Sequence, residues 1–243
     1  MYSRARLCLP LFALLSLLAL ALAACSSSTS TPTPASAPTP TPAPKASPVA
    51  DVLAQSAAAM GKVTSFSFDL QSQGGDTPLP LGLSMRSASG QLLKSGALSA
   101  TIKAVIPGSV IDLRTISIGG KSYLTDPLTG KWLTFDGAAS PVNFLDPATG
   151  VARILGSLAV PVVTDAGDAY RVTGTLAAGD ARFIAGSVSP GGILQAQLEI
   201  GKKDLLLRKV TLQGRITDQE SAGIVRTLTL AGFNQPFAIQ PPA

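Results

Sequence analysis

Residues 116–132 read Ile-Ser-Ile-Gly-Gly-Lys-Ser-Tyr-Leu-Thr-Asp-Pro-Leu-Thr-Gly-Lys-Trp. Gly119 and Gly120 separate two runs of strand-forming residues, which predicts a two-residue β-hairpin turn. The Asp-Pro-Leu-Thr-Gly stretch at 126–130 contains the residues that favour a second turn, and a further strand-like run follows it. This stretch therefore predicts three short strands that pair antiparallel.

The same strand pattern recurs on both sides of this stretch. Apolar and polar residues alternate within several segments, as expected for an antiparallel sheet with one buried face and one face in water. Residues 193–200 are the clearest example, because Leu194, Ala196, Leu198 and Ile200 share one face. The other segments that we expect to be strands are 66–70, 79–85, 209–216 and 224–230.

Two segments have helical spacing of apolar residues. Residues 50–62 form the first, with Gly61 as its stop signal, and residues 147–158 form the second. A long antiparallel meander with two helices covering its apolar face is an α+β domain. Residues 49–243 are long enough to form one such domain with a sizeable core.

The N-terminus has the features of an exported lipoprotein. A positively charged start and an uncharged run at 7–24 end on Leu22-Ala23-Ala24-Cys25. We expect residues 1–24 to be a signal peptide and Cys25 to become the lipidated first residue of the mature chain. An uncleaved membrane helix is the alternative, but such a helix needs ~20 apolar residues and Pro10 interrupts this run.

Residues 25–48 comprise the lipidated cysteine and a tether rich in Ser, Thr, Pro and Ala. Repeated Thr-Pro steps favour an extended chain, whose reach at ~3.1 Å per residue is about 70 Å. Loss of Arg4 and Arg6 with the signal peptide lowers the formal charge from +5 to +3. This weak, scattered charge does not indicate nucleic-acid binding.

The residues needed for common catalytic sites are missing. The chain has no histidine, and its two cysteines are Cys8, in the signal peptide, and Cys25. A catalytic triad, a thiol nucleophile and a zinc site are therefore not expected. Gly119-Gly120-Lys121-Ser122 resembles the end of a phosphate-binding loop, but Thr115 stands where that motif needs glycine. We expect neither enzymatic activity nor a cofactor.

Three segments resemble a known family in their order and spacing. They are residues 59–68, residues 116–132, and Asn-Phe-Leu-Asp-Pro at 143–147 with Gly150-Val151 and Ile154-Leu155 after it. Across about the whole domain, the chain resembles the LppX/LprA/LprF/LprG lipoproteins. This resemblance implies a half-barrel in which a curved antiparallel sheet wraps helices, with an apolar cavity between them, and no enzymatic activity.

The resemblance also implies a function. Members of this family bind long acyl chains of lipids or glycolipids and help to carry them across the cell envelope. We therefore expect a lipid-anchored protein on the extracytoplasmic face of the cell membrane, a monomer, whose ligand is a membrane lipid or acylated glycolipid. A lipid exporter is a further expected partner. A surface scaffold associated with an exporter, without a carrier role, is the alternative function.

The expected cavity residues are large apolar side chains on the helices and strands. The alternative for each of them is ordinary packing in a closed core. They are Leu53, Met60, Phe66, Phe68, Leu83, Met85, Leu113, Ile118, Tyr123, Phe144, Ile154, Leu155 and Leu158.

Overall fold

The computed structural model describes residues 48–79, 82–136 and 147–243. Twelve strands in these residues form one antiparallel sheet. Their bounds are β1 (Ser65–Gln73), β2 (Thr77–Pro78), β3 (Ser84–Leu93), β4 (Leu98–Ile106), β5 (Ser109–Ile118), β6 (Lys121–Thr125), β7 (Trp132–Asp136), β8 (Ala159–Ala166), β9 (Ala169–Ala177), β10 (Ile193–Gly201), β11 (Leu207–Gln213) and β12 (Val225–Ala231).

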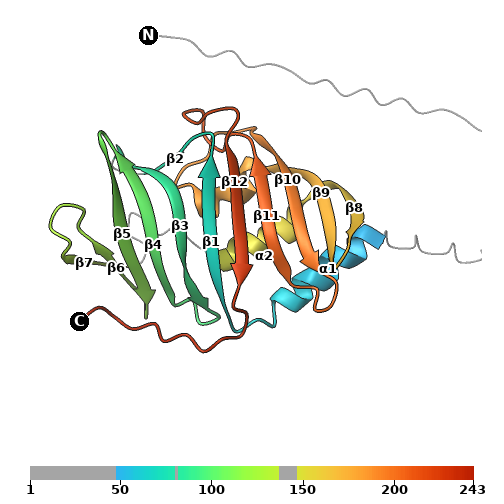
Figure 1. Ribbon diagram of the computed structural model, residues 1–243, viewed down its shortest axis with the longest axis horizontal. Helices are drawn as coiled ribbons and strands as arrows, with labels where there is room; N and C mark the ends of the chain where they lie inside the picture. Colours follow the sequence, from blue (N-terminus) through green and yellow to red (C-terminus); the bar gives the residue numbers. More distant parts are fainter. Residues whose placement is uncertain (1–47, 80–81, 137–146) are drawn as a thin grey trace, which may run out of the picture. The chain divides into compact units, whose positions relative to one another are not determined.

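The order of the strands differs from the single meander that the sequence predicts. It is β7-β6-β5-β4-β3-β1-β12-β11-β10-β9-β8, with β2 paired to β3 (Figure 1). The first strand, β1, therefore lies in the middle of the sheet. The following strands continue to the β7 edge, and β8 begins the second series of strands at the opposite edge. Leu70 of β1 pairs with Leu228 of β12, which joins the two meanders. Local turn signals cannot predict this pairing because its partners are far apart in sequence.

The predicted hairpin at 116–132 is confirmed. Ile118 pairs with Lys121, and both intervening glycines have positive φ, as a two-residue hairpin turn requires. In the following turn, the Asp126 carboxylate accepts hydrogen bonds from the backbone N–H groups of Leu128 and Thr129, at 3.0 and 2.7 Å. These hydrogen bonds, that of Thr129 foremost, lower the pKa of Asp126 below its usual value.

Three helices in the described residues accompany the sheet. They are α1 (Pro48–Met60), α2 (Pro147–Ser157) and the short 3-10 helix η3 (Ala178–Ile184). Helix α1 begins two residues earlier than predicted because proline suits the first helical turn. Helix η3 was not predicted, since so short a segment shows no apolar periodicity. None of the helices in the described residues has the length and apolarity needed to span a bilayer.

One predicted strand begins later than its sequence pattern indicates. Apolar residues alternate from Leu79 to Met85, but β3 begins at Ser84. Gly82 has φ +73°, and the Leu79 N–H donates to the Leu83 carbonyl at 2.8 Å, so the chain turns before the strand. A pattern of alternating side chains cannot exclude such a turn, because it does not report backbone conformation.

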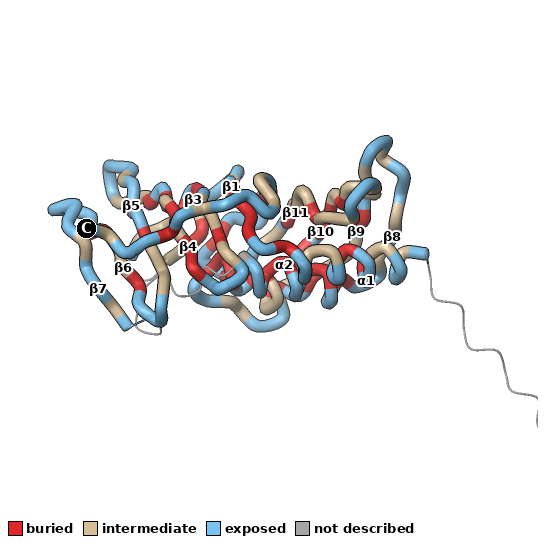
Figure 2. Tube along the Cα trace, turned by 90° about the horizontal axis from the view of Figure 1, so that it is seen from below, coloured by how far each residue is buried: buried red, intermediate tan, exposed pale blue. Residues whose placement is uncertain are grey.

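The core lies between the sheet and the helices. Helices α1 and α2 cross one face of the β8–β12 half of the sheet (Figure 1), and buried stretches of both layers face each other (Figure 2). The predicted inward face of β10 is confirmed, since Leu194, Ala196, Leu198 and Ile200 are all buried. A curved open antiparallel sheet with helices on one face is the predicted α+β half-barrel.

A buried ion pair lies where β12 begins. Arg226 donates to the Glu220 carboxylate, and the two side chains are 1% and 0% exposed. Arg226 also donates to the Thr77 hydroxyl at 3.0 Å and the Gly214 carbonyl at 3.1 Å. Burial lowers the pKa of Arg226, and the hydrogen bond with Glu220 opposes that shift. This network connects the β11–β12 loop to β2 and β12.

Candidate functional site

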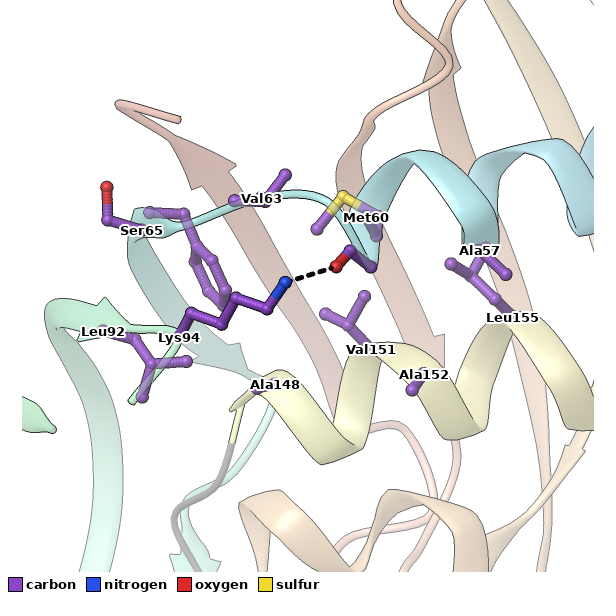
Figure 3. Close-up of a pocket in the computed structure, with 12 residues that line it drawn as sticks. Ala57, Met60, Val63, Ser65, Leu92, Lys94, Ala148, Val151, Ala152 and Leu155 are labelled. Carbon is purple, nitrogen blue, oxygen red and sulfur yellow. Dashed lines mark hydrogen bonds between the residues drawn. The ribbon is translucent and has the colours of Figure 1, made fainter. Parts of the chain in front are cut away.

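An apolar cavity of about 250 Å³ lies between the end of α1, the start of β1, the end of β3 and helix α2 (Figure 3). Its location matches the expectation of an apolar space between helices and sheet. The lining residues are Ala57, Met60, Gly61, Val63, Ser65, Phe66, Leu92, Lys94, Ala148, Val151, Ala152 and Leu155.

Helical spacing explains which side chains of α1 and α2 reach the cavity. Ala57 and Met60 lie three residues apart, so they share one face of α1. On α2, the four residues from Ala148 to Leu155 that line the cavity follow the i, i+3, i+4, i+7 pattern of one helical face. Three of these six positions are alanine. We infer that these short side chains let the two helices contact each other and leave a space beside that contact.

Lys94 lies at the edge of this cavity. Its backbone N–H donates to the Thr64 carbonyl at 2.8 Å, which holds the residue beside the start of β1. Its Nζ donates to the Gly61 carbonyl at 3.1 Å, just beyond the end of α1. The Lys94 side chain therefore extends from the end of β3 toward α1, next to the apolar lining (Figure 3).

The segment after β12 lies beside the same cavity. The Phe66 and Phe233 rings have centroids 6.3 Å apart, and the Arg208 guanidinium lies 4.8 Å from the Phe233 ring centroid. Asn234 accepts hydrogen bonds from the Thr64 N–H at 2.9 Å and the Thr64 hydroxyl at 3.1 Å. The C-terminal segment thus supports the strand that supplies Phe66.

The structure brings three of the predicted cavity residues together at this cavity, namely Met60, Phe66 and Leu155. Six others are buried within the apolar core instead of lining the cavity. Contact of any of them with a ligand stays a prediction. These six are Leu53, Phe68, Met85, Leu113, Ile154 and Leu158.

The remaining predicted residues have other environments. Leu83 is partly buried and packs against the core. Tyr123 pairs with Ile116, which lies one position after the inward-facing Thr115 and three after the inward-facing Leu113. Tyr123 and Ile118 therefore lie on the outer face of the sheet. Neighbouring positions along a strand point to opposite faces of the sheet, and a list of apolar residues does not show which face is buried. Phe144 and the lipidation residue Cys25 lie outside the described residues.

Sequence reasoning missed the small and polar residues of the cavity. Ala57, Ala148 and Ala152 were not predicted because alanine is common on both the buried and the exposed faces of helices. The helical period of α2 is the signal that could have identified Ala148 and Ala152. Lys94 gave no signal, since only the folded chain brings it to the cavity.

The chemistry of the cavity suits apolar ligands. Among the described residues, its lining contains one ionisable side chain, Lys94, and no carboxylate. In the part of the chain that the structure describes, no cluster of His, Cys, Asp and Glu could hold a metal ion. Burial of an apolar group is therefore the main interaction that this lining offers.

Comparisons with known proteins agree with this architecture. The LprF lipoprotein of Mycobacterium bovis has a similar structure, with a TM-score of 0.60 and 19% identity over 80% of this chain and 97% of that chain. For the lipoprotein LppX of Mycobacterium tuberculosis the TM-score is 0.52, with 17% identity over 79% of this chain and 98% of that chain. A search among curated proteins found no match.

The sequence itself matches a family model. The model of the LppX_LprAFG lipoproteins matches residues 48–239, which include every helix and strand described above. This family consists of lipoproteins and not of enzymes, in agreement with the prediction. The protein therefore belongs to the LppX_LprAFG lipoprotein family.

Proposed function

We propose that this protein binds an acyl chain of a membrane lipid or acylated glycolipid in the cavity between α1, α2 and β1, and carries that lipid across the cell envelope. The observation that supports this most directly is the apolar lining itself, in a member of a lipoprotein family. A carrier needs such a site because an acyl chain does not cross water readily.

Burial of an acyl chain in this cavity would be strongly favourable. Each buried methylene contributes ~0.8 kcal/mol, so full burial of a sixteen-carbon chain amounts to roughly 12 kcal/mol. Ordering of the chain and of the cavity walls reduces the affinity that results. The net affinity is then lower than burial alone would give, which favours the release that a carrier requires.

The size of the cavity limits how much of a chain it holds. Its volume of about 250 Å³ is just below the ~300–1,000 Å³ typical of sites for small molecules. A complete long chain would therefore need more room than the structure shows. We include in the proposal that α1 and α2 move apart to admit it, because both helices line the cavity.

The proposed anchor is a second lipid, covalently attached. The Cys25 thiol takes a diacylglycerol before the signal peptide is cleaved, and two or more acyl chains hold a protein stably on a membrane. Residues 25–48 then connect the anchor to the folded domain. In this proposal, the covalent lipid determines location, and the lipid in the cavity is the cargo.

Solvent extraction of the purified full chain, followed by mass spectrometry, tests the binding. We expect about one extractable acyl lipid per protein molecule. In the variant Leu155→Trp a large side chain fills the cavity, so bound lipid should be lost. Leu133→Trp is the matched control, because Leu133 is 42% exposed on β7 and lies outside the cavity. Wild-type protein without stoichiometric lipid would contradict the proposal.

Carriage is tested separately from binding. Donor vesicles that contain a fluorescent acyl lipid are mixed with acceptor vesicles and the full chain, and transfer is followed over time. We expect faster transfer with the wild type and the Leu133→Trp control than with Leu155→Trp. Binding without accelerated transfer would show that the protein binds lipid but does not carry it between membranes.

A further inference from the structure

We propose that Lys94 selects lipids whose head group carries a negative charge, so that the ligand class is an anionic acyl lipid. This inference rests on the proposed function, because it assigns a second part of the ligand to the same cavity. Lys94 is suited to this role by its position, by its hydrogen bonds, and by the absence of a carboxylate partner among the described residues.

The position of Lys94 suits a head group. Its side chain lines the cavity together with Val151 and Phe66, and it is exposed to water (Figure 3). An acyl chain inside the cavity would therefore leave its polar end close to the ammonium group. One lipid molecule can meet both environments, with its apolar part buried and its charge in water.

No acidic side chain of the described residues forms an ion pair with Lys94. Lys103 pairs with Asp112 at 3.0 Å and Arg86 with Asp76 at 3.1 Å. In the described residues, by contrast, no carboxylate lies within 4.0 Å of Lys94 Nζ, whose partner is the neutral Gly61 carbonyl. An ammonium group has three N–H donors. The contact with Gly61 uses one of them, so a ligand oxyanion can accept from another.

The structure also holds the base of this side chain in place. The backbone hydrogen bond from Lys94 to Thr64 connects the residue to the strand that contributes Phe66. The hydrogen bond from Nζ to the Gly61 carbonyl then holds the ammonium group between the end of α1 and the start of β1. Such restriction favours one charged contact over random association with the protein surface.

The expected selectivity is modest. An ion pair that is open to water is weak and is screened by salt. We therefore expect a preference of about threefold to fivefold for an anionic lipid over an uncharged lipid with the same acyl chains. That preference should decrease as the salt concentration rises.

Competition for a fluorescent fatty-acyl probe bound to the full chain tests the inference. The competitors are phosphatidylglycerol, diacylglycerol and phosphatidylcholine with the same acyl chains, and palmitate. Phosphatidylglycerol should displace the probe at about threefold to fivefold lower concentration than diacylglycerol. The palmitate arm shows whether a carboxylate can replace the phosphodiester.

Variants separate the role of Lys94 from a general effect of charge. Lys94→Gln should lose the preference for phosphatidylglycerol over diacylglycerol, whereas Lys94→Arg should retain that preference. Lys121→Gln removes the same charge from the β5–β6 hairpin, outside the cavity, and should keep the preference.

Two negative results have different meanings. Equal displacement by charged and uncharged lipids, or a preference that survives in Lys94→Gln, would overturn this inference and leave lipid binding intact. Failure of the wild type to bind the probe or any competitor would overturn the proposed function itself.

Discussion

The two ends of β1 differ in how they are closed. At its first residues, Ser65 and Phe66 line a cavity whose lining is mostly apolar. At its other end, Ser72 pairs with Arg226, which forms a fully buried ion pair with Glu220. One strand therefore runs from an open, apolar end of the half-barrel to a closed, polar end.

The difference shows how polar groups decide where a half-barrel can open. At the closed end, Glu220 accepts from Arg226 and from the backbone N–H groups of Ile216 and Thr217, so opening would break several buried contacts at once. At the open end, the contacts of Asn234 and Lys94 are exposed. Water or a ligand can replace those exposed contacts at low cost. We therefore expect the half-barrel to open more readily at the Phe66 end.

The largest effect should come from the buried ion pair. Arg226→Leu leaves Glu220 as an unpaired buried carboxylate, so the free energy of unfolding should decrease by about 3–5 kcal/mol. Urea denaturation measures this loss. The double variant Arg226→Leu/Glu220→Leu is the control, and it should lose less than the single variant because no buried charge remains. A loss below about 1 kcal/mol in the single variant would show that water enters this end.

Truncation of a leucine at each end sharpens the comparison. Leu194 is 0% exposed and lies beside Gly214 at the closed end, whereas Leu155 is 4% exposed and lines the cavity. We expect Leu194→Ala to cost about 4 kcal/mol and Leu155→Ala about 2 kcal/mol, because Leu155 already borders empty space. Denaturation midpoints of the two variants provide the measurement. Equal losses would mean that both ends are packed alike.

The open end should tolerate loss of its hydrogen bonds. Asn234 has φ +59° and accepts two hydrogen bonds from Thr64. Asn234→Ala should therefore cost about 1–2 kcal/mol, and Asn234→Gly less, since glycine adopts this φ without strain. Hydrogen exchange of the Thr64 amide, compared with that of Thr217, reports whether opening is confined to this end. Faster exchange at both amides in the Asn234 variants would show that the two ends do not open independently.

A turn outside both ends provides a reference for acid titration, with the smallest expected effect. Hydrogen bonds to its carboxylate lower the pKa of Asp126, so its stabilising contribution is present above its unfolded pKa of about 3.9. That contribution is lost as the pH falls through the lower folded value. NMR titration of the Thr129 amide should show this in the wild type and not in Asp126→Asn. Unfolding of either end at a higher pH than the titration of this turn would indicate an acid-sensitive group elsewhere.

Much of the fold could be predicted because it depends on local patterns. The hairpin at Gly119-Gly120 follows from turn chemistry, and the inward face of β10 follows from strict alternation. Helix η3 and the turn at Gly82 could not be predicted, since neither changes the spacing of apolar residues. The pairing of β1 with β12 has no local signal at all.

The candidate site was predicted less completely than the fold. Large apolar residues such as Leu53 and Ile154 have the character expected of a cavity, yet they are packed in the core. Alanine positions such as Ala57 and Ala152 help to form the cavity because their side chains occupy little space. Composition does not distinguish a side chain that fills the core from one whose small size leaves a cavity open.

The sequence by itself determined the strand and helix pattern, the predicted lipidation signal at Cys25 and the family resemblance. Each of these depends on residues that are neighbours along the chain. Only the tertiary structure decided that Phe66, Lys94 and Leu155 line one cavity, and that Arg226 and Glu220 close the opposite end. These contacts join distant segments, and whether they enclose space or fill it depends on how the side chains pack in three dimensions.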